Sequence, residues 1–160
     1  MKTIVTALAL SLGFGVTALA APASTAAMGP VRAFIDGLNK GDIAAATAAH
    51  ATDVSIIDEF PPHIWRGPKA FQTWLADFAK DKTVTEPVMT LGKTTRADVS
   101  ADRAYLVVPA TFTFKSKGEP MREPGQFVFV VRKAVGAWKI AAWAWAGGKA
   151  RPVTAAAAAK

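Results

Sequence analysis

The sequence predicts an α+β fold in which N-terminal helices lie against a curved antiparallel sheet and leave a pocket between the two. Apolar residues recur at helical spacing in the first half of the chain, and from Pro87 onward they alternate with a period of two. A segment from Thr52 to Phe78 joins the halves as a strand, a turn and an amphipathic helix, and it holds the clustered acidic and basic groups. We therefore expect the functional site in this segment.

Length and composition favour one domain, because 160 residues with 51% hydrophobic content can bury a substantial core. Residues 1–20 have the pattern of a signal peptide: Lys2, an apolar stretch, and the small-residue ending Ala18-Leu19-Ala20. The apolar stretch, residues 4–16, is shorter than the roughly 20 residues of a membrane-spanning helix. We expect cleavage near Ala20, with a retained anchor as the alternative.

The chain contains no cysteine, which excludes disulfides, thiolate metal sites and lipid-modified cysteines. Together with the signal peptide, this predicts a periplasmic or secreted protein without a stable membrane anchor. Lys and Arg outnumber Asp and Glu by 19 to 12, yet the basic residues are dispersed and resemble no nucleic-acid motif. We expect no nucleic-acid partner, and the charge supports solubility or a weak attraction to acidic ligands and anionic envelope surfaces.

Three helices are expected. Residues 21–28 lack periodicity and are predicted to be a flexible leader. The first helix starts at Pro30 and ends at Gly41, a residue suited to the left-handed position. Asp42 caps a second, shorter helix over residues 43–50. The apolar face of the first helix consists of Val31, Phe34, Ile35 and Leu38.

The third helix follows a buried strand around residues 54–57 and a turn at Pro61-Pro62. Gly67 and Pro68 are expected to open it, with proline at its first position. Its apolar face consists of Phe71, Trp74, Leu75 and Phe78.

The rest of the chain predicts a meander of long antiparallel strands. The expected strands cover residues 87–96, 104–114, 127–131 and 138–146, with turns at 97–102, 117–120 and 134–136. Residues 149–160 show no core-facing pattern and are expected to form a loose tail.

The last strand carries its bulky residues on both parities: Trp138 and Ile140 on one, Trp143 and Trp145 on the other. Either a bulge near Ala141-Ala142 resets the faces, or both faces are covered. Because helices cover one face only, and the preceding strands also carry bulky residues on both parities, we expect a homodimer through the sheet.

The order of these elements resembles the nuclear transport factor 2 superfamily, in particular its SnoaL-like and ketosteroid isomerase-like branch. The resemblance covers residues 29–148 and is carried by short segments in a fixed order. These are residues 31–34, 38–42, 52–54, 57–58, 65–67, 71–78 and 138–140. The resemblance implies a cone-shaped curved antiparallel sheet with three N-terminal helices enclosing an apolar pocket.

In the ketosteroid isomerases of this superfamily the general base is an aspartate late in the first strand, and the matching residue here is Asp58. Their oxyanion hole uses a tyrosine, where this chain has Phe34, and a protonated aspartate, where it has Gly125 or Gln126. The loss of each donor costs about 3 kcal/mol of transition-state stabilisation, which argues against steroid isomerisation.

Epoxide hydrolases of the superfamily use an Arg and two Asp, and its dehydratases use a His with an Asp. The resemblance therefore makes Asp58, His63 and Arg66 the candidate catalytic residues. Asp58 is followed by Glu59, and a desolvated carboxylate next to another carboxylate has a raised pKa. The alternatives are a solvated acidic turn, a surface histidine and a surface charge.

The candidate ligand-binding residues are aromatic, and they favour an apolar or aromatic small molecule. They are Phe34, Trp65, Trp74, Phe112, Phe127 and Trp143. Tyr105 is either a hydrogen-bond donor or an interface residue. His50 is expected to be structural, as a cation at a helix end. Two histidines and scattered acids predict no metal and no cofactor.

Two hypotheses follow. The first is an exported domain that binds a small apolar molecule and uses Asp58 in an isomerase, dehydratase or hydrolase step, assisted by His63 or Arg66. The second is a non-catalytic binding or dimerisation module of the same fold. Whether Asp58 faces a closed cavity, within hydrogen-bond reach of a second titratable group, separates the two.

Overall fold

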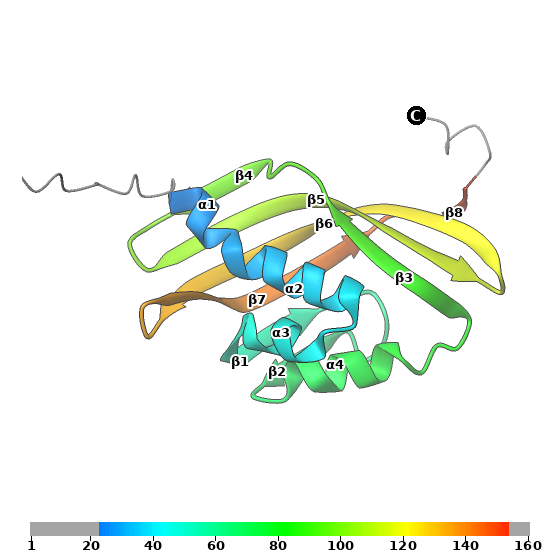
Figure 1. The fold of residues 1–160 in the computed structure, drawn as a ribbon, viewed down its shortest axis with the longest axis horizontal. Coiled ribbons are helices and arrows are strands. Elements are labelled where there is room, and N and C mark those ends of the chain that lie inside the picture. The colour runs from blue at the N-terminus through cyan, green and yellow to red at the C-terminus, as the bar shows by residue number, and fades with distance from the viewer. Residues whose placement is uncertain (1–22, 154–160) are drawn as a thin grey trace, which may run out of the picture.

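The computed structural model describes residues 23–153, so the predicted signal peptide and the last residues of the tail lie outside the described part of the chain. Four helices pack on one side of a curved sheet (Figure 1). They are α1 (Ala23–Ala27), α2 (Gly29–Lys40), α3 (Ile43–Ala48) and α4 (Ala70–Phe78). Within residues 23–153, none of the helices has the length and apolarity to cross a membrane.

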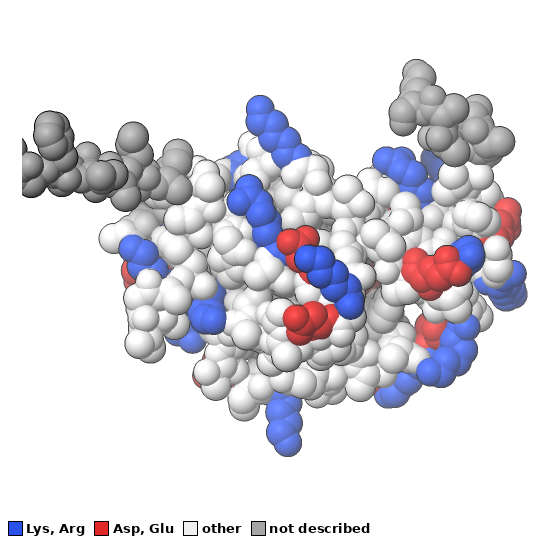
Figure 2. All heavy atoms as spheres, in the orientation of Figure 1, with Lys and Arg blue, Asp and Glu red and all other residues white. Residues whose placement is uncertain are grey.

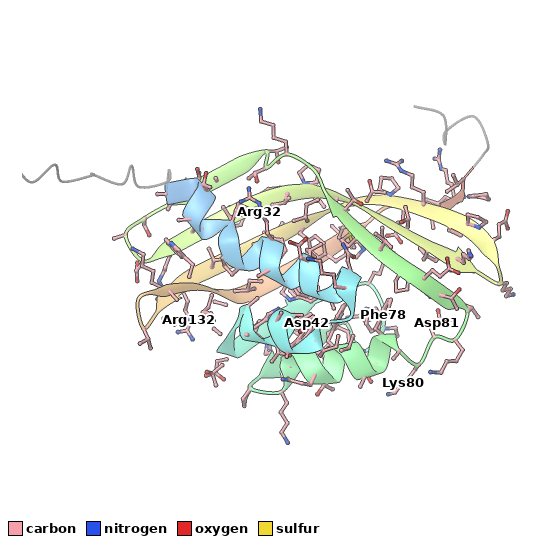
Figure 3. All side chains as sticks on the ribbon, viewed as in Figure 1. Arg32, Asp42, Phe78, Lys80, Asp81 and Arg132 are labelled. Carbon is pink, nitrogen blue, oxygen red and sulfur yellow. The ribbon has the colours of Figure 1, made fainter. Side chains whose placement is uncertain are left out.

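The three expected helices are confirmed as α2, α3 and α4. Gly41 ends α2 in the left-handed conformation (φ 70°), and Asp42 accepts a hydrogen bond from the Ala45 amide at 2.9 Å to cap α3. Helix α4 begins at Ala70, so Pro68 precedes the helix instead of occupying its first position. Asp42 and Phe78 mark the start of α3 and the end of α4 in Figure 3.

Helix α1 corrects the prediction of a flexible leader over residues 21–28 for its described part, residues 23–28. Ala27 and Met28 are buried in the core, and the Met28 amide donates to Ser24 O at 3.1 Å. Burial of these two side chains holds the segment in place. The segment is too short to show a helical periodicity in its sequence, which is why the helix was not predicted.

The sheet has eight strands, ordered β2-β1-β7-β6-β5-β3, with β4 beside β5 and β8 beside β6. The N-terminal strands are β1 (His50–Ile57), β2 (Ile64–Gly67) and β3 (Val84–Leu91). The meander continues with β4 (Arg96–Val99), β5 (Arg103–Ser116), β6 (Glu119–Ala134), β7 (Ala137–Gly147) and β8 (Arg151–Pro152). All pairs are antiparallel except β1 with β7, which is parallel. A parallel pair is possible there because α4 and the whole meander connect those strands.

Four predictions for the strands and the tail need correction. The strand expected over residues 87–96 is β3, which covers Val84–Leu91 and ends before residues 92–95. Residues 96–99 form β4 against β5, where a turn was expected over 97–102. Strand β6 starts at Glu119, eight residues before the predicted strand, because a long partner in β5 extends its hydrogen bonding. Arg151 and Pro152 pair with Arg122 and Met121 of β6, so the start of the predicted loose tail is ordered.

A β-bulge at Ala141 resolves the parity problem of the last strand. Val130 pairs with Ala142 and Val131 pairs with Ile140, which leaves Ala141 without a partner. Ile140, Trp143 and Trp145 are consequently all buried, at 0%, 2% and 8% exposure. The bulge predicted near Ala141-Ala142 is confirmed, and the tryptophans of β7 give no reason to cover the far face of the sheet.

One side chain of helix α2 forms hydrogen bonds with the main chain of the edge strand β3. Asn39 donates to Met89 O at 2.8 Å and accepts from the Met89 amide at 2.9 Å, which reproduces the hydrogen bonds of a neighbouring strand. This contact brings the end of α2 over β3 and closes one side of the space beneath the helices.

Candidate active site

A cavity of about 180 Å³ lies between helices α2 and α4 and the sheet. Its wall includes five of the six aromatic residues that were expected to bind a ligand, and three further aromatic side chains. The five are Phe34, Trp74, Phe112, Phe127 and Trp143, and the three are Phe60, Phe78 and Trp145. A chamber of this size with aromatic walls suits a compact apolar molecule.

Asp58 lies in the wall of this cavity, directly after β1, and is 8% exposed. Its Oδ2 accepts a hydrogen bond from Trp74 Nε1 at 2.8 Å, and its Oδ1 accepts one from the Glu59 amide at 2.7 Å. Burial raises the pKa of Asp58 to about 6, against the opposing effect of the Trp74 hydrogen bond. The expectation that Asp58 faces a pocket agrees with this geometry.

A second buried carboxyl, Glu123, lies beside this end of the cavity and was missed by the sequence analysis. It is 5% exposed, and its Oε1 has no hydrogen-bond partner. Burial and the nearby Glu59 carboxylate raise the pKa of Glu123 to about 7, against the opposing effect of the Trp145 indole, and the charge of Asp58 also raises it. A Cβ atom on Gly147 would collide with Glu123 Oε1 and Glu59 Oε2, so both carboxylates lie against that glycine.

Glu123 was detectable from parity. Phe127, Phe129 and Val131 face the core, and two further steps of two residues along the same strand lead to Gly125 and Glu123. The predicted strand stopped at Phe127 and left Glu123 outside it. Gly125 is required beside Trp145, because an added Cβ would lie 2.5 Å from the indole ring.

His63 and Arg66 do not line the cavity. His63 is exposed in the loop between β1 and β2, where its Nδ1 lies 3.2 Å from the main-chain oxygen of Asp58. Arg66 is exposed on β2, paired with Ser55. The predicted grouping of both side chains with the Asp58 carboxylate is therefore absent from the described residues.

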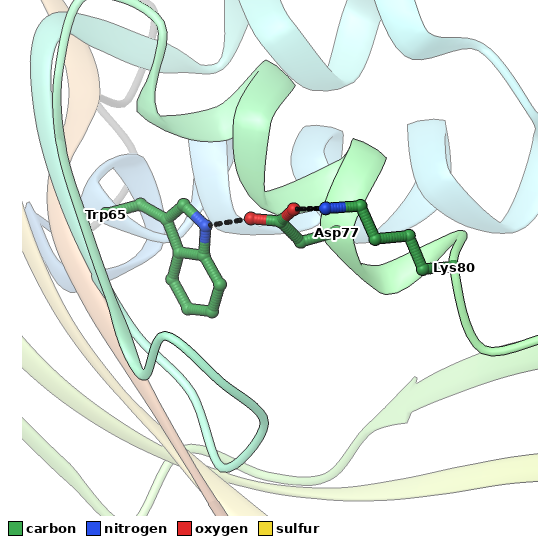
Figure 4. Close-up of polar contacts among 3 residues, drawn as sticks. All are labelled: Trp65, Asp77 and Lys80. Atoms are coloured by element: carbon green, nitrogen blue, oxygen red, sulfur yellow. Dashed lines mark hydrogen bonds and ion pairs between the residues drawn. The ribbon is translucent and has the colours of Figure 1, made fainter.

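Trp65 is buried at 5% exposure but lies outside the cavity wall, unlike the other five predicted aromatic residues. Its Nε1 donates to Asp77 Oδ2 at 2.8 Å, and Asp77 Oδ1 accepts from Lys80 Nζ at 2.6 Å (Figure 4). Trp65 thus joins β2 to α4 and supports the helix that carries Trp74.

His50 is structural, as expected, but neutral. Its Nδ1 lies 2.8 Å from Ala46 O, and its Nε2 accepts from Trp143 Nε1 at 3.1 Å, which sets the tautomer. Burial lowers the pKa of His50 to about 4. The expected cation at the helix end is wrong because β1 begins at this residue and carries the ring into the core, stacked on Phe71.

The described residues offer no metal site, and the surface charges are mixed. Within residues 23–153, no group of three or more His, Cys, Asp or Glu side chains has the arrangement of a metal site. On the face shown in Figure 2, basic and acidic side chains are interspersed.

The SnoaL-like domain family matches residues 31–143 of this chain. No curated protein matches it. Three solved structures illustrate the shared fold. The hexachlorocyclohexane dehydrochlorinase LinA-type3 from Novosphingobium barchaimii has a TM-score of 0.71 at 12% identity, covering 82% of this chain and 90% of the other. A putative scytalone dehydratase from Novosphingobium aromaticivorans has 0.67 at 15% identity, covering 81% and 87%.

The third structure, a ketosteroid isomerase-like protein from Erwinia carotovora atroseptica, has a TM-score of 0.64 at 21% identity, covering 79% of this chain and 96% of the other. At these identities the likeness concerns the fold, which is the curved, unclosed sheet of the nuclear transport factor 2-like cone. The predicted fold class is confirmed.

Proposed function

Because the chain belongs to the SnoaL-like domain family, we propose that it binds a single-ring apolar or aromatic molecule and uses Asp58 as an acid or base on it. The observation that carries this proposal is one buried carboxyl in the wall of a cavity lined mostly by aromatic and aliphatic side chains. A cavity of about 150 Å³ is known to admit benzene, and the cavity here is of similar size, at about 180 Å³. A fused four-ring ligand is too large for it.

The proposed chemistry is proton transfer at carbon next to a carbonyl or leaving group, as in an isomerase or dehydratase step. In a hydrolase step the same carboxylate would take a proton from the attacking water instead. With a pKa of about 6, Asp58 is ionised at neutral pH and more basic than an ordinary aspartate. Trp74 holds the carboxylate by Oδ2, so its position is fixed before a substrate enters. Exclusion of water by the aromatic wall strengthens electrostatic interactions at the site.

The test combines binding with turnover. Quenching of tryptophan fluorescence by benzyl alcohol reports occupancy, because Trp74, Trp143 and Trp145 line the cavity. Loss of water from a single-ring β-hydroxy ketone, followed by ultraviolet absorbance, reports proton transfer. We expect Asp58→Asn to lower that rate by about 100-fold or more with little change in binding. Equal rates for the wild type and the variant would contradict a catalytic Asp58.

A non-catalytic binding module of the same fold is the second candidate, and one observation favours it. Both oxygens of Asp58 already accept hydrogen bonds, from Trp74 and from the Glu59 amide, and within residues 23–153 no titratable side chain is hydrogen-bonded to the carboxylate. Tight binding of single-ring molecules without turnover of any would support this module.

We further propose that the protein is exported, after cleavage near Ala20, and that it forms a homodimer through the far face of the sheet. The far face carries half-buried side chains such as Val107, Val128 and Ala144. Light scattering during size-exclusion chromatography tests the dimer, and a monomer at micromolar concentration would contradict it. N-terminal sequencing of periplasmic and culture-medium fractions tests export.

A further inference from the structure

Three carboxyl groups, Asp58, Glu59 and Glu123, converge beside the cavity, and we call them the acid cluster. They come from the end of β1, the loop that follows and strand β6. Asp58 and Glu59 line the cavity. Glu123 lies next to Glu59 at Gly147, and its charge interacts with those of both other carboxylates.

The acid cluster has no cationic partner in the described part of the chain, although Lys and Arg are in excess in the sequence. The ion pairs within residues 23–153 are Lys80–Asp77, Arg96–Asp98, Arg103–Asp102 and Lys115–Glu86, and none includes a member of the cluster. His63 exerts the weakest of the effects that shift the pKa of Asp58. Uncompensated negative charge at a buried site is costly unless a ligand neutralises it.

Glu123 provides an independent indication of a ligand. It is 95% buried, and its Oε1, which lies at Gly147 together with Glu59 Oε2 and the Trp145 indole nitrogen, has no hydrogen-bond partner. A buried carboxylate oxygen without a donor is rare in folded proteins, and a bound donor would satisfy it. Glu59 is exposed and lines the cavity, so a ligand can reach this end from solvent.

We propose that the acid cluster binds the protonated amine of a single-ring aromatic ligand whose ring occupies the cavity. This inference rests on the proposed function and narrows its ligand class to primary ammonium compounds. An ammonium group has three donors, enough to contact Glu59 and the free oxygen of Glu123 together. The indole of Trp145, which lines the cavity and whose Nε1 lies near Gly147, adds a cation–π contact.

The geometry favours an organic cation over a metal ion. Within residues 23–153, the three carboxyl groups lie near one another but do not have the arrangement that a metal ion requires of its ligands. The adjacent wall is mostly aromatic and aliphatic, which suits a ring attached to the ammonium group.

The test compares benzylamine with benzyl alcohol, which match in size and differ in charge. Calorimetric titration of the full chain at pH 8 is expected to show at least tenfold tighter binding of the amine. Glu123→Gln is expected to reduce that preference at least fivefold while it leaves benzyl alcohol binding unchanged. Glu119→Gln, at an exposed acid of the same strand, is the matched control and is expected to keep the full preference.

The outcomes separate the two proposals. Equal affinities for benzylamine and benzyl alcohol would overturn the inference and indicate that Glu59 and Glu123 satisfy each other by sharing a proton. Failure of both compounds to bind would overturn the proposed function as well. If Glu123→Gln does not fold, Glu59→Gln serves in its place, since Glu59 is exposed. An unchanged preference in that variant would also contradict the inference.

Discussion

Asp58 and His50 are buried side chains whose pKa values move in opposite directions, and their effects on stability oppose each other. Folding raises the pKa of Asp58 from 3.8 to about 6. The stability that comes from keeping this carboxyl protonated is therefore lost as the pH rises from 3.8 to about 6. The pKa of His50 falls from 6.5 to about 4, so its contribution is lost as the pH falls across that window. Each amounts to about 3 kcal/mol.

Single variants should reveal both effects. Asp58→Asn removes a carboxylate that is costly to ionise. Its free energy of unfolding, relative to that of the wild type, is therefore expected to increase by about 3 kcal/mol as the pH rises from 4 to 7. His50→Gln removes a base that resists protonation. Its free energy of unfolding, relative to that of the wild type, is expected to increase by a similar amount as the pH falls from 6.5 to 4. Urea unfolding across this range measures both, and a pH-independent difference for either variant would contradict its assigned burial.

Trp74 and Trp65 each donate to an aspartate, and the pair allows a matched comparison. Trp74→Phe removes the donor to Asp58 Oδ2, and because that hydrogen bond lowers the pKa, the variant should titrate above pH 6. Trp65→Phe removes the donor to Asp77 instead and should leave Asp58 unchanged. Carbon-13 NMR of the carboxyl groups measures both. The same shift of Asp58 in both variants would rule out a specific role for Trp74.

At the residue scale, the sequence predicted the position of Asp58 in the cavity wall but did not identify Glu123. Asp58 follows an apolar strand, three residues before the proline turn, and it matches the general-base position of the superfamily; these two signals located it. The burial of Glu123 depends on β7, which brings Trp145 and Gly147 against it from more than 20 residues away. His63 and Arg66 were grouped with Asp58 by a superfamily pattern, and the path of the β1–β2 hairpin carries both to the surface.

The hairpin between β6 and β7 contains a strained residue. Val135 and Gly136 form its two-residue loop, both with positive φ (49° and 78°), and Val135 is fully exposed. A β-branched residue is unfavourable in this conformation, whereas asparagine adopts it readily. Val135→Asn should therefore raise the free energy of unfolding by about 1 kcal/mol.

The β5–β6 hairpin supplies the control for that prediction. Lys117 occupies the equivalent position with φ 51°, but lysine lacks the branch at Cβ, so Lys117→Asn should gain less. Thermal unfolding of both variants gives the comparison. A loss of stability in Val135→Asn would show that the loop has another conformation.

The Asn39 side chain links α2 to the exposed edge strand β3 through two hydrogen bonds. Asn39→Ala removes two hydrogen bonds to the Met89 main chain and should cost about 1 kcal/mol. It should also increase amide hydrogen exchange at Met89 more than at Val131 in the centre of the sheet. Uniform exchange rates in the variant and the wild type would mean that β3 is held by its pairing with β5 alone.

At the element scale, periodicity located the three main helices and the long strands because each has one apolar face. It missed β2 and β4, since a strand of four residues carries too little alternation to distinguish from a turn. It also missed the parallel pairing of β1 with β7, which brings together segments about 90 residues apart in the sequence. The bulge at Ala141 was predictable because its two flanks placed tryptophan and isoleucine on conflicting parities.

The whole molecule is a curved sheet whose buried aromatic residues lie on the helix-covered side, around a cavity that they leave partly unfilled. Aromatic composition predicted which residues would face inward, but the sequence does not reveal whether rings fill that side completely. The cavity volume of about 180 Å³ depends on how α2 and α4 are positioned against β3 and β5, and tertiary packing determines that position.

The account depends on Asp58 being a buried carboxyl in the wall of an open apolar cavity. Titration of Asp58 by carbon-13 NMR in the full chain tests this most directly. The structure predicts a pKa of about 6, together with a change in that resonance when benzyl alcohol is added. A pKa at or below 4, unaffected by the ligand, would show that Asp58 faces water and does not act as an acid or base in the cavity.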